Sequence, residues 1–260
     1  MDKKITGLSS SPAPLTDETT QSGAKKVSTK KIGIIGAMDE EVDMLKNSIT
    51  DMKVTTVAGM DFCEGKLGGI DSVVVKCNMG KVNAGVCAQL LISRFEVGCV
   101  INTGVAGSLD AKIDIGDIVV STEAVQHDYD LVHIGGKPGE LLDYGIVAFK
   151  ADDDMRRYAV EAVRETAPEV KAFEGRICSG DQFIASKEQK ARIVDTFGGL
   201  CCEMEGAAIA QVCYMNSTPF VIIRAISDKA DDSEEMSFEV FKKDAAERCA
   251  GIAKYIAAHE

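Results

Sequence analysis

The stretch IGIIGAMDEEV, residues 32–42, decides the fold. It opens with a short apolar run that ends in glycine, as buried strands do, and continues into three consecutive acids. Acids favour the N-terminus of a helix, and Val42, Leu45 and Ile49 then recur at helical spacing. A strand that turns through glycine into a helix is the building unit of α/β proteins. The stretch therefore predicts an α/β domain.

Further short apolar runs predict a sheet enclosed by helices. The runs 62–67 and 70–77 flank Gly68 and Gly69, a favoured pair for a two-residue hairpin turn. Several runs are continuously apolar rather than alternating, which indicates that both faces of the sheet are covered. Other strands are predicted at 99–101, 118–120, 173–178 and 220–223, a glycine-rich turn at 104–107, and helices at 83–95, 153–165, 188–196, from Met204 and at the C-terminus. We predict a single-domain three-layer α/β/α sandwich with a central mixed, mostly parallel sheet.

The N-terminal residues differ in composition from the rest. Residues 1–29 are rich in Ser, Thr, Lys, Pro and Gly, which is typical of a disordered tail or an expression remnant. Ordered structure is expected to begin at Lys31, and the domain to span residues 30–260. Residues 126–150 show no clear period and contain several glycines, which predicts a long functional or interface loop.

Composition argues against several classes of partner. The formal net charge of −12 leaves no basic footprint for nucleic acid. No apolar run approaches the roughly 20 residues that a membrane span needs, and the N-terminus lacks the apolar block of a secretory signal. The nine cysteines lie mostly in apolar runs, which predicts buried thiols in a reducing cytoplasm. With three histidines and no cysteine knuckle, we predict neither a metal site nor a cofactor.

Polar residues, glycines and carboxylates follow the predicted strands. In open α/β sheets, ligands collect beyond the carboxyl ends of the strands. Glu41, Glu205 and Asp228 occur at such positions, although each alone is explained as a helix-start or turn acid. Because five separate segments bring such residues to one edge of the sheet, we predict a site there. The segments are 36–41, 102–107, 179–184, 203–205 and 224–228.

These segments resemble the motifs of one enzyme family. The 5′-methylthioadenosine/S-adenosylhomocysteine nucleosidases have sequences similar to GIIGAMDEE at 33–41, INTGVAG at 101–107, SGDQFI at 179–184, EMEGAA at 203–208 and RAISD at 224–228. The motifs occur in the family's order from about Lys31 to the C-terminus. The resemblance implies the nucleoside phosphorylase fold and hydrolysis of the N-glycosidic bond of these two adenine nucleosides. Adenine and a 5-thioribose product would be released, without a cofactor.

The resemblance also implies roles for individual residues. Glu41 matches the general base that activates water, and Asp228 matches the acid that protonates N7 of the leaving adenine. Glu205 resembles the residue that holds the ribose hydroxyls, and Phe183 the ring that stacks on the purine. The full set of implied substrate-binding residues is Met38, Gly107, Phe183, Ile184, Glu203, Met204, Glu205, Ser227 and Phe238.

The predicted reaction needs these residue types. Cleavage of a ribosyl–purine bond builds positive charge on the sugar, which nearby carboxylates stabilise more in the transition state than in the ground state. A general base delivers water to the anomeric carbon. The purine anion is a poor leaving group, so the implied role of Asp228 requires a carboxyl that holds its proton near neutral pH, as burial can arrange.

Three other functions fit parts of the pattern. A purine nucleoside phosphorylase needs arginines and backbone N–H groups to hold phosphate, whereas the three acids at 39–41 repel phosphate and suit water. An aminofutalosine hydrolase would use the same residues as the predicted nucleosidase. A non-catalytic nucleoside-binding protein would not need all three carboxylates.

The chain departs from the family at two positions of the implied pocket. Val105 stands where the family often has serine, and Gln182 stands where a small residue is common. Both changes alter the shape of the pocket, so the sequence does not rank one adenine nucleoside above another.

The resemblance implies a homodimer. Residues 126–142 correspond to the region in which the family's partner subunit closes the 5′ pocket, with Leu131, Ile134 and Leu142 as candidate contacts. The adjacent pair His127 and Asp128 is predicted to have a structural role in this loop rather than to act as a catalytic dyad.

Overall fold

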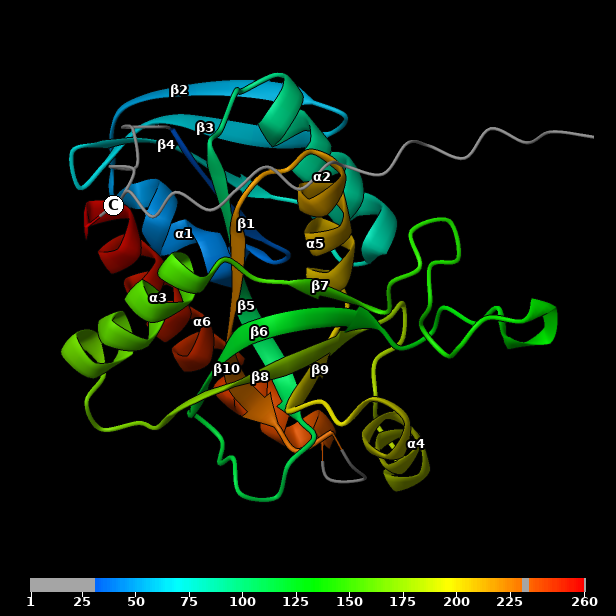
Figure 1. The fold of residues 1–260 in the computed structure, drawn as a ribbon. Helices are drawn as coiled ribbons and strands as arrows, with labels where there is room; N and C mark the ends of the chain where they lie inside the picture. Colours follow the sequence, from blue (N-terminus) through cyan, green and yellow to red (C-terminus); the bar gives the residue numbers. More distant parts are fainter. Residues whose placement is uncertain (1–30, 231–233, 260) are drawn as a thin grey trace, which may run out of the picture.

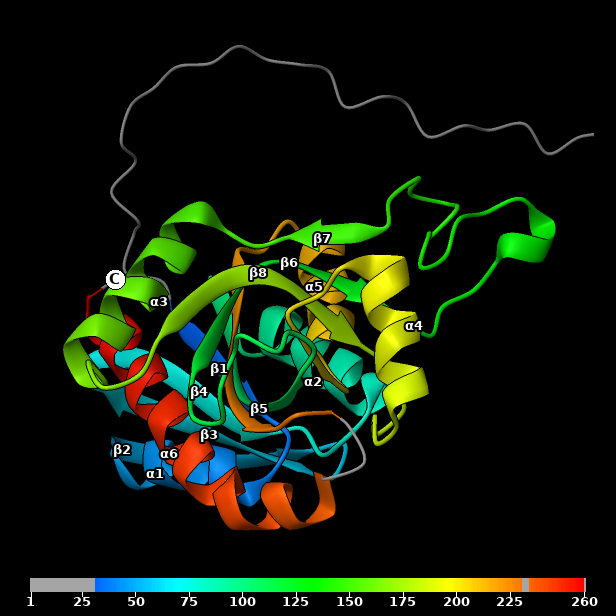
Figure 2. The same ribbon diagram turned by 90° about the horizontal axis from the view of Figure 1, so that it is seen from below.

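The computed structural model describes residues 31–230 and 234–259. Figures 1 and 2 show a central sheet with helices on both faces. Residues 1–29, predicted to be a tail, lie outside the described residues. In chain order the elements are β1 (Ile32–Gly36), α1 (Asp39–Asn47), β2 (Ile49–Val57), β3 (Met60–Leu67), β4 (Ile70–Lys76), α2 (Lys81–Ser93), β5 (Cys99–Ser108), β6 (Ile118–Gln126), η1 (Val132–Ile134), β7 (Ala148–Lys150), α3 (Asp153–Thr166), β8 (Ala172–Ser179), α4 (Lys187–Phe197), β9 (Cys201–Glu203), α5 (Gly206–Met215), β10 (Phe220–Asp228) and α6 (Glu234–His259).

The described strands form one mixed sheet, and part of it closes into a ring. β1 pairs in parallel with β4 on one side and with β5 on the other. β10 pairs with both β5 and β6, β6 with β8, β8 with β9, and β9 with β5, so these five strands close on themselves. Antiparallel β3 and β2 extend the open side beyond β4. Because β1, β5 and β10 are parallel, their carboxyl ends meet at one edge.

Two apolar cores lie on opposite faces of the sheet. One core includes residues of α2 and α5, and the other includes residues of α1, α3 and α6 (Figure 1). Within β1, Ile35 belongs to the first core whereas Ile32 and Ile34 belong to the second, as the alternation of side chains along a strand requires. Since helices cover both faces, the predicted three-layer α/β/α arrangement is confirmed.

The structure corrects several predicted boundaries. Ile49 begins β2 instead of continuing the first helix, because Ser48 caps α1. Residues 104–107 belong to β5 and are not a turn, and residues 224–228 complete β10 instead of following it. Glu203 ends the short strand β9, so α5 begins later than the predicted start at residue 204.

The segment between β6 and β7 protrudes from the body of the molecule (Figures 1 and 2). The predicted long loop is interrupted by the single turn η1, and its end forms strand β7, paired with β6. The predicted hairpin is present: Gly68 and Gly69 have φ values of 61° and 92°, a left-handed conformation that glycine adopts without strain. None of the helices in the described ranges has the length and apolar character needed to cross a bilayer.

Candidate active site

One cleft lies at the carboxyl ends of several strands and is lined by polar side chains that occur there. Its space, open solvent at the mouth included, is about 570 Å³, and a concave, mostly apolar lining of this kind is typical of small-molecule sites. Ten of the eleven predicted site residues line it: Met38, Glu41, Gly107, Phe183, Ile184, Glu203, Met204, Glu205, Ser227 and Asp228. The eleventh, Phe238, lies on α6, and its side chain is outside the described residues. Residues of the lining that were not predicted as site residues are Ala37, Met79, Val105, Ala106, Gln182 and Cys202.

Glu41 is held at the start of α1 by three backbone N–H groups. Its Oε2 accepts hydrogen bonds from Ala37 (2.5 Å) and Met38 (3.0 Å), and its Oε1 accepts one from Val105 (3.1 Å). The residue is 3% exposed, and burial raises the pKa of its carboxyl above the ordinary value. A Cβ at Gly104 would lie 2.5 Å from Oε1, so only glycine leaves room for the carboxylate here.

Asp228 occupies a similar place at the end of β10. Its Oδ2 accepts a hydrogen bond from the Ser227 hydroxyl (2.8 Å), and its Oδ1 accepts one from the N–H of Ala230 (2.9 Å). The residue is buried. A Cβ at Gly107 would lie 2.6 Å from Oδ1. Two glycines of β5, at 104 and 107, therefore each make room for one buried carboxyl group.

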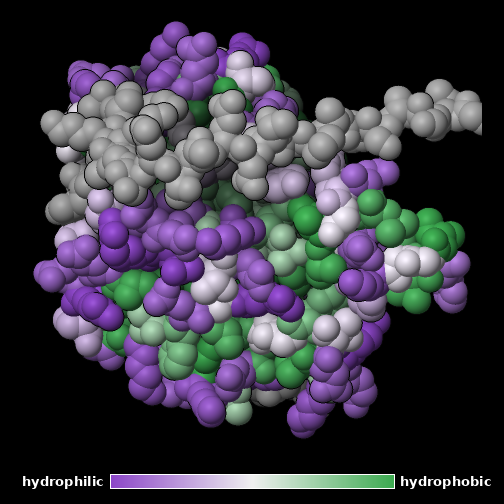
Figure 3. Space-filling model, viewed as in Figure 1, coloured by the Kyte–Doolittle hydropathy of each residue, from purple (hydrophilic) through white to green (hydrophobic). Residues whose placement is uncertain are grey.

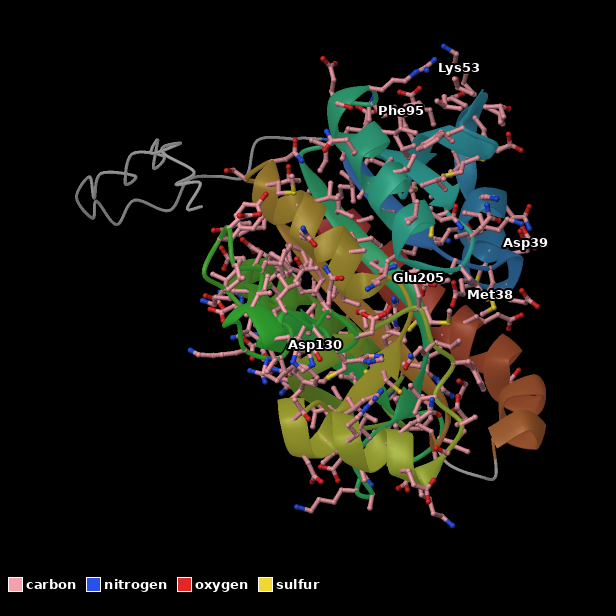
Figure 4. The ribbon with its side chains drawn as sticks, turned by 90° about the vertical axis from the view of Figure 1, so that its right-hand side faces the viewer. Met38, Asp39, Lys53, Phe95, Asp130 and Glu205 are labelled. Atoms are coloured by element: carbon pink, nitrogen blue, oxygen red, sulfur yellow. The ribbon has the colours of Figure 1, made fainter. Side chains whose placement is uncertain are left out.

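Glu205 connects two helix N-termini. It occupies the N-cap position of α5, and its Oε1 accepts a hydrogen bond from the N–H of Gly80 (2.8 Å), the N-cap residue of α2. Figure 4 shows it in the interior of the molecule beside α2, whereas Asp39 lies at the outer surface. Burial and the neighbouring charge of Glu203 raise the pKa of Glu205 to about 8.

Replacing Glu205 with glutamine is expected to weaken the pH dependence of stability. The ordinary pKa of a glutamate is 4.5, so the unfolded chain loses this proton at a lower pH than the folded chain, which holds it to about 8. Below pH 4.5 the carboxyl stabilises the fold, and this contribution is lost as the pH rises towards 8. Over this window the stability of the parent chain should fall more steeply with rising pH than that of the variant, by up to about 1 kcal/mol per pH unit.

Urea unfolding of both chains at several pH values checks this expectation, with the exposed Glu161→Gln change as the matched control. Stability curves that run parallel for the parent chain and Glu205→Gln would contradict the account of this carboxyl.

Glu203 forms a buried ion pair with Arg224, at 2.5 Å. The same carboxylate accepts hydrogen bonds from the Ser179 hydroxyl and from the N–H groups of Glu205 (3.0 Å) and Gly206 (2.7 Å). Burial raises the pKa of Glu203, but the Arg224 charge and these donors outweigh burial and hold it below its ordinary value. Glu203 is therefore an ionised carboxylate whose main contacts fix the start of α5 and so the position of Glu205.

Arg224 was not singled out from the sequence. It is 2% exposed, and it donates to Asn102 at 2.5 Å as well as to Glu203. Its charge offsets part of the rise that burial causes in the pKa of Glu41 and of Glu205. The signal was present, because an arginine inside the apolar strand FVIIRAISD needs a buried anionic partner. The sequence alone did not identify that partner as Glu203, because the pairing depends on how β9 and β10 are placed in the fold.

The lining of the cleft is acidic and apolar. Among the described residues that line it, there is no lysine, arginine or histidine. Phe183 is half exposed at the rim, Ile184 is buried, and Met38 and Met204 add thioether side chains. Carboxylates in such surroundings stabilise developing positive charge, whereas phosphate would find no cationic side chain in the described lining.

Comparisons with known proteins agree with this geometry. The family model for the phosphorylase superfamily matches residues 31–258. The 5′-methylthioadenosine/S-adenosylhomocysteine nucleosidase of Psychromonas ingrahamii is 43% identical over 227 residues, which cover 87% of this chain and 97% of that protein. The chain belongs to the 5′-methylthioadenosine/S-adenosylhomocysteine nucleosidase family. It is therefore an enzyme of the N-ribosyl hydrolase class, as the motifs predicted.

Solved structures of nucleosidases have the same fold. The enzyme from Neisseria meningitidis, in complex with methylthio-immucillin-A, superposes with a TM-score of 0.86 at 37% identity and covers 89% of this chain and 100% of that one. The enzyme from Colwellia psychrerythraea, in complex with adenine, gives a TM-score of 0.85 at 40% identity, with coverages of 88% and 95%. Both likenesses confirm the predicted nucleosidase fold.

Proposed function

We propose that this nucleosidase hydrolyses the N-glycosidic bond of 5′-methylthioadenosine and S-adenosylhomocysteine, and releases adenine and the 5-thioribose product. The observation that carries the proposal is the group of three buried carboxyls, Glu41, Glu205 and Asp228, around a cleft with no described cationic residue in its lining. Such a site stabilises a positively charged ribosyl group and leaves water as the nucleophile.

Glu41 is the proposed general base. The three backbone N–H groups fix its carboxylate in one orientation, so that it receives the proton of a water molecule directed at the anomeric carbon. The raised pKa of Glu41 makes it a stronger base than an exposed glutamate.

Asp228 is the proposed general acid. It carries a proton before the bond breaks and passes it to N7, so that neutral adenine leaves instead of its anion. Its contacts with Ser227 and Ala230 fix the carboxyl at the end of β10. We assign Ser227 to the orientation of this group.

The remaining predicted residues bind the parts of the substrate. Glu205 would hold the ribose hydroxyls, with Met204 against the sugar. Phe183 would stack on the purine, and the backbone of Ile184 would contact the edge of the base. Phe238 is proposed, on sequence grounds alone, as a wall beside the 5′ substituent.

The proposal is tested by measuring adenine release from 5′-methylthioadenosine, S-adenosylhomocysteine and aminofutalosine under matched conditions. The expected result is turnover of the first two substrates. Binding of both without release would make the chain a non-catalytic nucleoside-binding protein. Turnover of aminofutalosine alone would make it a hydrolase for that nucleoside, with the same carboxylates in the same roles.

We also propose that the enzyme is a homodimer. Exposed apolar side chains lie on α2, where Val82 is 77% exposed, on α5 at Tyr214 and on the protruding segment at Tyr144. Tyr144 and Tyr214 meet edge to face at 5.9 Å, which joins the two surfaces. Figure 3 shows hydrophobic residues over the protruding segment and the adjoining surface, and Ile134 is 71% exposed there. An apolar face of this kind favours a protein interface.

Replacing Val82 with aspartate is expected to convert the dimer into monomers, because it places a charge on the apolar face. The new acid lies in the first turn of α2, where the helix dipole favours it, so the fold should be kept. Sedimentation velocity at low micromolar concentration measures the outcome. Val54→Asp on β2, an exposed valine outside this face, is the matched control and should leave the mass unchanged. A parent chain that sediments as a monomer would contradict the proposed homodimer.

We propose a cytoplasmic location. All nine cysteines are buried as thiols, which suits a reducing compartment.

A further inference from the structure

Three residues beside the cleft, Lys81, Asp128 and Asp181, form a closed set of contacts that we call the clasp; Asp181 directly precedes Gln182 of the cleft lining. Lys81 Nζ lies 2.6 Å from Asp128 Oδ1, Asp128 Oδ2 accepts the N–H of Asp181 (2.8 Å), and Asp181 Oδ1 accepts the N–H of Lys81 (2.8 Å). The three residues come from the start of α2, from the segment after β6 and from the segment after β8. The side chains of Lys81 and Asp128 are only 18% and 17% exposed, so water screens this ion pair weakly.

Two residues of the clasp, Lys81 and Asp181, lie close in sequence to groups that position the proposed site. Gly80, directly before Lys81, donates the hydrogen bond that holds Glu205. Asp181 lies two residues before Phe183, in a segment without regular secondary structure. Gly80 also packs closely against the clasp: a Cβ at this position would lie only 3.1 Å from Asp181 Oδ1.

The other side of the clasp is anchored in the body of the protein. The N–H of His127 donates to Ser179 O (2.9 Å), and a Cβ at Gly180 would meet the His127 ring at 2.5 Å. Lys81 Nζ also donates to Gln126 Oε1 (3.1 Å). Burial raises the pKa of Asp128, but Lys81 and the N–H of Asp181 outweigh it and lower that pKa, so this carboxylate stays ionised.

From this geometry we propose that Lys81 and Asp128 are positioning residues, which fix the purine-stacking segment and the start of α2 without touching the substrate. The proposal rests on the proposed function, and it goes beyond that function because it assigns a positioning role to Asp128, at the start of the protruding segment. Without the ion pair, the Asp128 carboxylate loses the cation that fixes it against the N–H of Asp181, so the exposed residues 181–183 are held less firmly. Substrate would then have to order Phe183 as it binds, at an entropic cost.

The expected signature is a change in binding more than in chemistry. Lys81→Met should raise KM by about tenfold, the factor that corresponds to ordering roughly one residue of backbone. Its kcat should change by less than about threefold, because the hydrogen bonds that orient Glu41 and Asp228 come from residues outside the clasp, Ala37, Met38 and Val105 for the first and Ser227 and Ala230 for the second. The dissociation constant of adenine alone should also rise, but by no more than KM, since adenine reports on the purine segment whereas KM also includes the proposed ribose contact of Glu205.

Three further chains sharpen the test. Lys81→Arg keeps the charge and should restore most of the adenine affinity. Asp128→Asn is nearly isosteric and breaks the same ion pair, so it replaces Lys81→Met in the test if that variant does not fold. Lys66→Met breaks the exposed pair between Lys66 and Asp71 at 2.9 Å and is the matched control, with no expected change.

The double variant Lys81→Met/Asp128→Asn should bind adenine no more weakly than the worse single variant, because the two side chains act as one unit. Folded single variants with unchanged KM and unchanged adenine affinity would overturn the proposal. That result differs from a failure of the proposed function, in which the parent chain itself would release no adenine.

Discussion

Replacing Asp228 with asparagine is expected to reduce kcat for adenine release by about 10³- to 10⁴-fold and to leave the chain folded. The amide has nearly the shape of the carboxyl, and its oxygen can still accept the hydrogen bond from Ala230. It cannot release a proton to N7 at neutral pH, so the adenine would have to leave as its anion. Binding of substrate should persist, because the stacking and ribose contacts are not altered.

The measurement is single-turnover adenine release together with the dissociation constant of a non-hydrolysable nucleoside analogue. Asp195→Asn, an exposed change of the same chemistry on α4, is the control and should be silent. A folded Asp228→Asn variant with a kcat within about threefold of the parent chain would show that leaving-group protonation does not depend on this residue.

Replacing Glu41 with glutamine is expected to slow turnover by about 10³-fold, because the amide cannot take a proton from the attacking water. The analogue should still bind, since Glu41 is proposed to act on water and not on the nucleoside. The same assignment predicts an acid limb in the pH profile of kcat. Burial raises the pKa of Glu41, so the ionised base is lost as the pH falls through a value above the ordinary 4.5.

The pH profile of kcat for the parent chain, the Glu41→Gln variant and the exposed control Glu161→Gln checks this prediction. The control should keep the parent profile. An acid limb that persists unchanged in the residual activity of Glu41→Gln would assign that limb, and the base, to another group.

The positions of the site residues were predictable because they follow from strand order. Residues after parallel strands reach the same sheet edge, so Glu41 and Asp228 came together without any knowledge of side-chain contacts. The distinction among neighbouring acids was not predictable from composition. Asp39 and Glu41 both occupy the first turn of α1, yet the side chain of Asp39 is 60% exposed and pairs with Lys76, whereas Glu41 is buried.

Other features depend on contacts between distant residues and could not be inferred from local patterns. The glycines at 104 and 107 suggested a turn, but they lie in β5. They are glycines because a Cβ at either position would collide with Glu41 or Asp228. The ion pair of Arg224 with Glu203 and that of Lys81 with Asp128 each join residues more than twenty positions apart. Strand β9 has three residues, which is too few for a periodic signal.

The phosphate dependence of adenine release tests the central claim most directly, because the acidic cleft is proposed to select water over phosphate. With 5′-methylthioadenosine in phosphate-free buffer, the parent enzyme should release adenine together with the free 5-thioribose sugar. Added phosphate should leave the rate unchanged. Release that requires phosphate and yields a ribose 1-phosphate product would contradict the account and make the chain a phosphorylase.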